Sequence, residues 1–216
     1  MYEQGMSARL LSLVFLLSPS LVFADDITPL RLALENQAKH KTVSVKVKQT
    51  KKIPALIENI VMVGHLWLNP GQSFRWQLGA PLVQSAVYDG NKLFLVDEMK
   101  KTVAALDPND RRAKPLLLML GIGEIASIEK MQEAFTVGDT TTVDEHLVVN
   151  LLPKGRMKRV INSMVMQINT RNSFPERLEW KQKDGTVVIT EFSPPVLNKK
   201  LPDGIFDLKH EGYTWE

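Results

Sequence analysis

Residues that could perform chemistry are few in this chain and lie far apart. Four histidines are separated by long intervals and form no paired spacing of the HExxH kind: His40, His65, His146 and His210. The chain has no cysteine, which excludes thiolate zinc sites, a cysteine nucleophile and disulfides. No serine stands in a GxSxG pattern. We therefore expect a protein that is not an enzyme and needs no metal or organic cofactor.

Two weaker patterns also bear on chemistry. Gly121-Ile122-Gly123 begins like a dinucleotide-binding loop, but it follows an apolar helical pattern instead of the strand that such a loop requires. His65 alternates with Trp67 on an expected strand, so the two share a face. His65 could orient a ligand or serve as a structural residue, and the pattern leaves both open.

Aromatic residues are more informative than the titratable ones. Phe74 and Trp76 are two residues apart on an expected strand and so share one face. Further aromatic residues fall on expected strands: Trp67, Tyr88, Phe94, Trp180 and Phe192. A sheet face lined in this way is filled either by the protein's own side chains or by an apolar guest. Both interpretations are compatible with the sequence.

Composition and the N-terminal segment narrow the class of protein. Of the 216 residues, 44% are apolar and 24% are charged, and the net charge of +3 is spread without a long basic run, so we expect no nucleic-acid partner. Arg9 precedes an apolar run over residues 10–17, which is far shorter than the ~20 residues of a spanning helix. Val22 and Ala24 fit the small-residue rule for signal peptidase. We expect residues 1–24 to be a cleaved signal peptide, starting at Met1 or Met6, and residues 25–216 to form one periplasmic domain.

Hydrophobic periodicity in residues 25–216 predicts a mainly β protein with helices. A helix is expected over residues 28–40, followed by about ten strands. Turn clusters at Asn69-Pro70-Gly71, Asp89-Gly90-Asn91 and Asp184-Gly185 predict antiparallel hairpins. The expected strands cover residues 42–48, 59–68, 73–78, 83–88, 92–96, 101–106, 147–152, 160–170, 177–182 and 186–192.

One segment interrupts the strand pattern. Residues 111–135 read as two short helices joined at a glycine hinge, and residues 115–120 are apolar on every side. Such a segment cannot face water, so it must cover the concave face of the sheet or a ligand held there.

Several short motifs together resemble the periplasmic outer-membrane lipoprotein carrier family (LolA-like). They are the end of the first strand, residues 45–49, then the segment 64–76 with its Leu66-Trp67, Pro70-Gly71 and Phe74-Arg75-Trp76 motifs, the segment 89–94, and the closing segment 201–208. The resemblance implies an incomplete antiparallel β-barrel closed by a helical lid. It further implies a monomeric carrier whose hydrophobic cavity takes the acyl chains of lipoproteins from an inner-membrane transporter to an outer-membrane receptor. The receptor is itself a lipoprotein, so a chain without cysteine matches the soluble carrier.

The resemblance and the strand pattern together give a set of expected cavity residues. The set comprises Trp67, Phe74, Trp76, Phe94, Leu116, Leu117, Leu118 and Leu120. We expect Phe74→Glu to abolish uptake of the ligand while folding is retained, since a charge disfavours burial of an acyl chain.

One position departs from the family pattern. An arginine implicated in latching the lid commonly precedes the Pro-Gly turn, whereas this chain has Asn69 there. A specialised paralogue that carries another lipid or hydrophobic product therefore remains an alternative to the general lipoprotein carrier. An enzyme on the same fold is a further alternative, because one fold can host unrelated sites.

Overall fold

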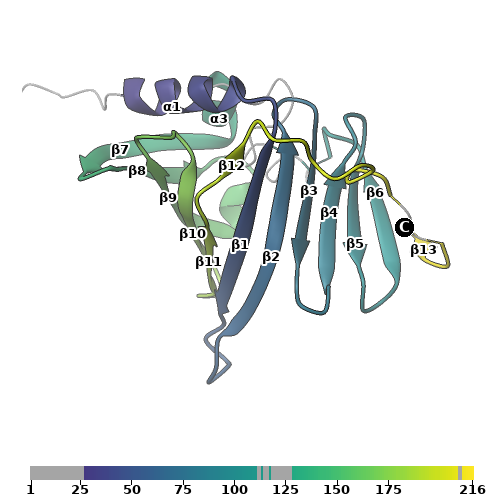
Figure 1. Ribbon diagram of the computed structural model, residues 1–216. Coiled ribbons are helices and arrows are strands. Elements are labelled where there is room, and N and C mark those ends of the chain that lie inside the picture. The colour runs from purple at the N-terminus through teal and green to yellow at the C-terminus, as the bar shows by residue number, and fades with distance from the viewer. Residues whose placement is uncertain (1–26, 111–112, 114–116, 118–127, 209–210) are drawn as a thin grey trace, which may run out of the picture.

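Alternating apolar and polar residues build one strongly curved sheet, seen in a computed structural model that describes residues 27–110, 113, 117, 128–208 and 211–216 (Figure 1). The longer strands are β1 (Val43–Lys52), β2 (Ile60–Asn69), β3 (Ser73–Leu78), β4 (Gln84–Tyr88), β5 (Leu93–Asp97), β6 (Thr102–Leu106), β7 (Phe135–Val143), β8 (His146–Pro153), β9 (Ile161–Asn169), β10 (Pro175–Gln182) and β11 (Val187–Phe192). Two short strands, β12 (Val196–Leu197) and β13 (Thr214–Trp215), complete it. The mainly β character is as predicted, and the described strands number thirteen instead of about ten.

Strand order shows that the sheet stays open. It runs β13-β6-β5-β4-β3-β2-β1-β11-β10-β9-β8-β7, with β12 paired to β1. The pairs are antiparallel apart from β13, which lies parallel to β6. The three predicted turn clusters do form hairpins, and Gly71, Gly90 and Gly185 take the positive φ that these turns require.

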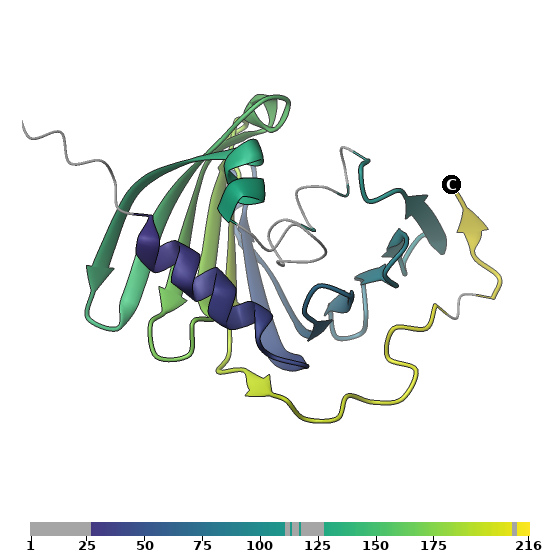
Figure 2. The same cartoon turned by 90° about the horizontal axis from the view of Figure 1, so that it is seen from above.

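Two helices cover one half of the sheet. Helix α1 (Thr28–Ala38) buries Leu30, Ala33 and Leu34, and helix α3 (Ile128–Ala134) buries Ile128 and Met131. These side chains form one apolar cluster with strands β7 to β10, and α1 runs across that half of the sheet (Figure 2). None of the helices in the described part of the chain combines the length and apolar character needed to cross a membrane.

A second apolar cluster lies on strands β1 to β6. It includes two residues of the segment expected to form the first lid helix, Ala113 and Leu117. Most of residues 111–127 lie outside the described residues, so the predicted helical lid is neither confirmed nor corrected.

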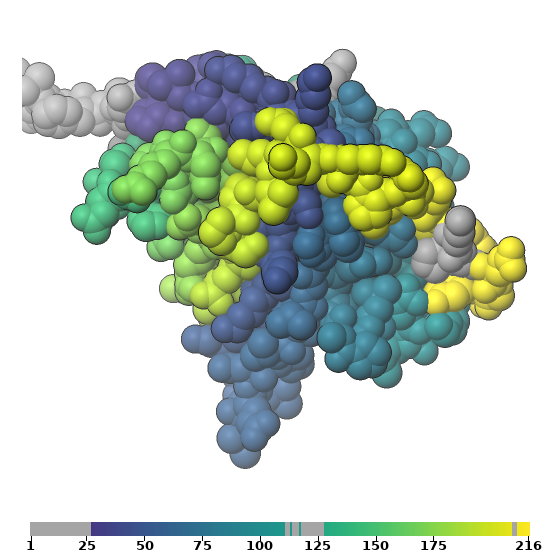
Figure 3. All heavy atoms as spheres, in the orientation of Figure 1, coloured from purple at the N-terminus to yellow at the C-terminus, as the bar shows by residue number. Residues whose placement is uncertain are grey.

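The C-terminal segment crosses the convex face of the sheet. From β12 it runs over strands β2 to β5 and ends at β13 beside β6 (Figures 2 and 3). The guanidinium of Arg75 holds it, since Nη1 donates hydrogen bonds to the carbonyl oxygens of Ile205 at 2.8 Å and Asp207 at 3.1 Å. We call its described residues, 198–208 and 211–216, the C-terminal strap.

Candidate functional site

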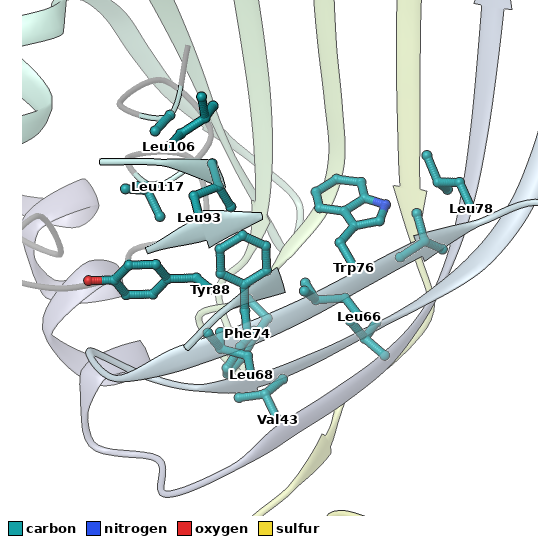
Figure 4. Packing of buried hydrophobic residues seen from close by; sticks show 14 residues of the cluster. Val43, Leu66, Leu68, Phe74, Trp76, Leu78, Tyr88, Leu93, Leu106 and Leu117 are labelled. Atoms are coloured by element: carbon teal, nitrogen blue, oxygen red, sulfur yellow. The ribbon is translucent and has the colours of Figure 1, made fainter. Parts of the chain in front are cut away.

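The concave face of the sheet gathers the largest apolar side chains of the β1–β6 half. Register places Leu66 opposite Trp76 and Leu68 opposite Phe74, so these four side chains share one face. Phe74 is fully buried, and its ring lies 6.3 Å from that of Tyr88 (Figure 4). Phe74 is therefore a packing residue at the base of this face.

Trp76 occupies the centre of the concave face. Its indole meets Phe192 of β11 edge to face, with ring centroids 6.1 Å apart, although β1 and β2 separate their two strands. Curvature of the sheet is what brings them together. The indole Nε1 is buried and has no hydrogen-bond partner among the described residues. A buried donor of this kind is costly unless something accepts from it.

Two hollows meet at Trp76. The smaller, of about 40 Å³, lies toward α1 and β9 and is lined by apolar side chains that include Val43, Val45, Leu66, Leu68, Met166 and Phe174. The larger, of about 340 Å³, is bounded by Leu78, Ala86, Leu95 and Trp180, with Gln49 and Gln84 at its border. We call these the inner and the outer hollow. Ligand sites in proteins usually occupy about 300–1,000 Å³.

The prediction that Trp67 and Phe94 line the cavity is wrong. Trp67 pairs with Arg75, and Phe94 pairs with Val87, and all four alternate with the concave residues. They therefore lie on the convex face. There the Phe94 ring meets Trp215 of the C-terminal strap edge to face at 6.0 Å.

His65 also lies on the convex face, away from both hollows. Its ring stacks on Trp67 at 4.2 Å between centroids, and Nε2 is 2.7 Å from the Ser44 hydroxyl. Burial lowers the pKa of His65, and the charge of Lys46 lowers it further. These contacts favour the structural role over ligand orientation.

Among the expected lid residues, the structure places one. Leu117 is buried in the same cluster as Phe74 and Trp76 and lies near Leu93 and Leu106 (Figure 4). Leu116, Leu118 and Leu120 lie outside the described residues. Four residues that line the two hollows were not predicted as cavity residues from the sequence; they lie on β2, β5 and β10 and are Leu66, Leu95, Leu178 and Trp180.

Titratable groups give no catalytic cluster within the described residues. No three histidine, aspartate or glutamate side chains converge there as metal ligands. His146 Nε2 instead lies 2.8 Å from Glu176 Oε2 on the surface. His210 and Gly121-Ile122-Gly123 lie outside the described residues. The surface of the concave face is mainly apolar.

Comparison with known proteins agrees with this architecture. The family model described as "Outer membrane lipoprotein carrier protein LolA" matches residues 32–209. The chain belongs to the LolA family. No curated protein sequence matches the chain at a significant level.

Solved structures similar to this LolA family member share little sequence with it. An uncharacterized conserved protein from Thermus thermophilus is 9% identical with a TM-score of 0.52, and the match covers 87% of this chain and 98% of that one. A LolA superfamily protein from Nitrosomonas europaea is 13% identical with a TM-score of 0.44, covering 82% and 96% of the two chains. The lipoprotein LppX from Mycobacterium tuberculosis is 9% identical with a TM-score of 0.38, covering 82% and 96%. The first similarity shows a shared fold.

Proposed function

We propose that this protein is a periplasmic carrier that holds acyl chains of lipoproteins on the concave face and moves them from the inner to the outer membrane. The observation that carries the proposal is the pair of apolar hollows that meet at Trp76. Membership of the LolA family supports it. In this account residues 1–24 are a cleaved signal peptide, and residues 25–216 act as a single monomeric domain without catalytic activity or cofactor. Its partners are an inner-membrane transporter and an outer-membrane receptor.

Apolar lining is what an acyl chain needs. Burial of one methylene contributes about 0.8 kcal/mol, so a ten-carbon stretch gains roughly 8 kcal/mol before the cost of ordering the chain. Leu78, Leu95 and Trp180 supply that surface in the outer hollow. The buried indole N–H of Trp76 could donate to an ester or amide oxygen of the cargo.

Size limits what the described hollows hold. The outer hollow, at about 340 Å³, is at the low end for a ligand site, and the inner one is much smaller. Uptake of several acyl chains therefore requires the concave face to open wider than the two hollows.

A specialised carrier of another lipid or hydrophobic product is the second candidate. The amide of Asn69 donates to the Ser73 hydroxyl at 3.4 Å, so it serves the β2–β3 turn where family members commonly have the latch arginine. Loss of that arginine favours an altered cycle of opening and closing.

Native mass spectrometry of the protein purified from the periplasm separates these candidates. A general carrier should retain triacylated lipoprotein, and its depletion should disturb lipoprotein sorting to the outer membrane. A specialised carrier should retain another lipid and be dispensable for sorting. A protein that is always empty and binds no acyl probe would contradict both, and turnover of a small substrate would favour an enzyme.

A further inference from the structure

The β1–β2 hairpin projects beyond the rest of the sheet and exposes apolar side chains. Ile57 at its tip is fully exposed, and Leu56, Ile60, Val61 and Val63 are about half exposed. Strand β3 pairs with β2 only from Gly64 onward, so the end of the hairpin extends past its neighbour (Figures 1 and 3). We call residues 51–63 the hairpin tip. Because neighbouring strand residues point to opposite faces, these side chains expose apolar surface on both sides of the projecting hairpin, and such surface marks an interaction site.

Backbone pairing holds the tip in place. Strand β1 pairs with β11 as far as Lys52, and Lys51 lies opposite Ile60 within the hairpin. A turn closes the end, where the Leu56 amide donates to the Ile53 carbonyl at 2.9 Å. The β10–β11 turn supports it, since a Cβ on Gly185 would lie 3.0 Å from Pro54 Cγ. The apolar side chains are thus presented outward by ordered backbone.

Basic residues lie in the connections at the same end of the sheet as the tip. The β8–β9 connection adjoins the end of β10, since the Lys183 amide donates to the Val160 carbonyl at 2.8 Å, and the β10–β11 turn adjoins the tip. These three connections and the end of β10 carry the basic residues Lys51, Lys52, Lys154, Arg156, Lys158, Arg159, Lys181 and Lys183. The acidic residues in the same connections are Glu58 and Asp184. The whole chain has a net charge of only +3, so positive charge is concentrated here.

We propose that the hairpin tip and its basic surroundings dock on an anionic phospholipid membrane, with Leu56 and Ile57 entering the interface between headgroups and acyl chains. Apolar insertion combined with attraction to anionic headgroups is the combination that holds peripheral proteins on bilayers. A projecting tip suits a bilayer better than it suits a peptide, because it offers no groove.

The position of the outer hollow fits this orientation. Leu78 and Gln84 border the hollow and flank the β3–β4 turn at the same end of the sheet as the tip. Gln49, also at its border, lies three residues before Lys52 on β1. A docked molecule would therefore bring the border of the hollow toward the bilayer. Docking itself needs no cargo, so its test is independent of the proposed carrier function.

Vesicle flotation of the mature protein tests the docking surface. Vesicles of phosphatidylglycerol and phosphatidylethanolamine should bind the protein, and vesicles of phosphatidylcholine alone should bind it weakly. Leu56→Asp should reduce binding to anionic vesicles at least about tenfold, because it replaces an inserted apolar side chain by a charge. Leu32→Asp on α1 is the matched control, since Leu32 is 53% exposed and Leu56 is 50% exposed. The control should bind like wild type.

A second pair of variants tests the charges. Each basic residue near an anionic surface strengthens binding about fivefold. K158E/R159E should therefore bind anionic vesicles at least about twentyfold more weakly than wild type. Added salt should also weaken the binding of wild type to these vesicles. K199E/K200E makes the same change of net charge at the opposite end of β1, where the Lys199 carbonyl accepts from Thr42, and should bind normally.

Two results would overturn the proposal. One is that the protein does not bind anionic vesicles, even if an acidic protein partner binds to the same surface. The other is an equal loss in the tip variants and their controls. Affinity for a soluble acyl probe should stay unchanged in all four variants, so failure of docking is distinguishable from failure of the carrier function.

Discussion

A glutamate introduced into the outer hollow should weaken acyl binding in a way that acid relieves. Leu95 lines this hollow and is only partly buried, so Leu95→Glu should fold with its carboxylate exposed to water when the hollow is empty. A bound acyl chain would strip that water away. Because an isolated carboxylate is disfavoured in apolar surroundings, the side chain would take up a proton when the chain binds.

Protonation sets the size of the effect. A free glutamate has a pKa of about 4.3, and each pH unit above it costs about 1.4 kcal/mol, so neutralising Glu at pH 7 costs about 3.7 kcal/mol. Affinity should therefore fall up to about 500-fold at pH 7. At pH 5 the same cost is about 1 kcal/mol, and the loss should shrink to about fivefold.

Titration with a fluorescent acyl probe that carries a neutral headgroup measures this directly, because only the protein then titrates. Phe94→Glu is the matched control: it adds the same charge one residue earlier on β5, but on the convex face. It should bind the probe normally at both values of pH. Equal losses in both variants, or a loss in Leu95→Glu that persists at pH 5, would refute the assignment of faces and the apolar character of the bound state.

Four further predictions concern packing and stability. Phe74→Ala should destabilise the protein by about 3–5 kcal/mol in urea unfolding followed by circular dichroism, because Phe74 is fully buried; a loss below about 1 kcal/mol would contradict its packing role. For the same reason Phe74→Glu should fail to fold, which replaces the expectation from sequence that folding is retained. Arg75→Met should release the C-terminal strap, seen as faster amide hydrogen exchange over residues 205–208, and unchanged exchange there would count against the two hydrogen bonds. Because the pKa of His65 is lowered in the folded protein, the unfolded chain binds a proton at this residue more readily than the folded chain does. The contribution of His65 to the free energy of unfolding is therefore present above about pH 6.5 and lost as the pH falls. His65→Gln should flatten the decline of the urea midpoint in that range, and an unaltered decline would exclude His65 as its source.

Strand positions were largely predictable from the sequence because apolar and polar residues alternate clearly between turn clusters. Strand β3 was predicted with its observed bounds, Ser73–Leu78. Strand β7 was missed because most of its residues are exposed, and a bulge between Val137 and Thr140 interrupts its register. Strands β12 and β13 are two residues long, too short for any periodic signal.

Whether side chains on different strands share a face depends on the register between the strands. The predicted set of cavity residues was partly wrong because it did not take the register into account. Aromatic character alone grouped Trp67 and Phe94 with Phe74 and Trp76. The β2–β3 turn, closing between Asn69 and Ser73, places Trp67 opposite Arg75 and so away from Trp76. Counting residue pairs across the β2–β3 and β4–β5 turns could have shown that Trp67 and Phe94 lie on the opposite face from Trp76. Curvature that brings Trp76 against Phe192 depends on long-range packing and has no local signal in the sequence.

Photo-crosslinking tests most directly whether the concave face holds acyl chains. A fatty acyl probe with a diazirine in its chain would be bound to the mature protein, irradiated, and its attachment sites mapped by peptide mass spectrometry. Attachment should occur at side chains around the two hollows, such as Leu66, Leu95 and Leu178, and unlabelled acyl chains should compete with it. Attachment confined to convex residues such as Val63 and Phe94, or none that competes, would contradict the binding of acyl chains on the concave face.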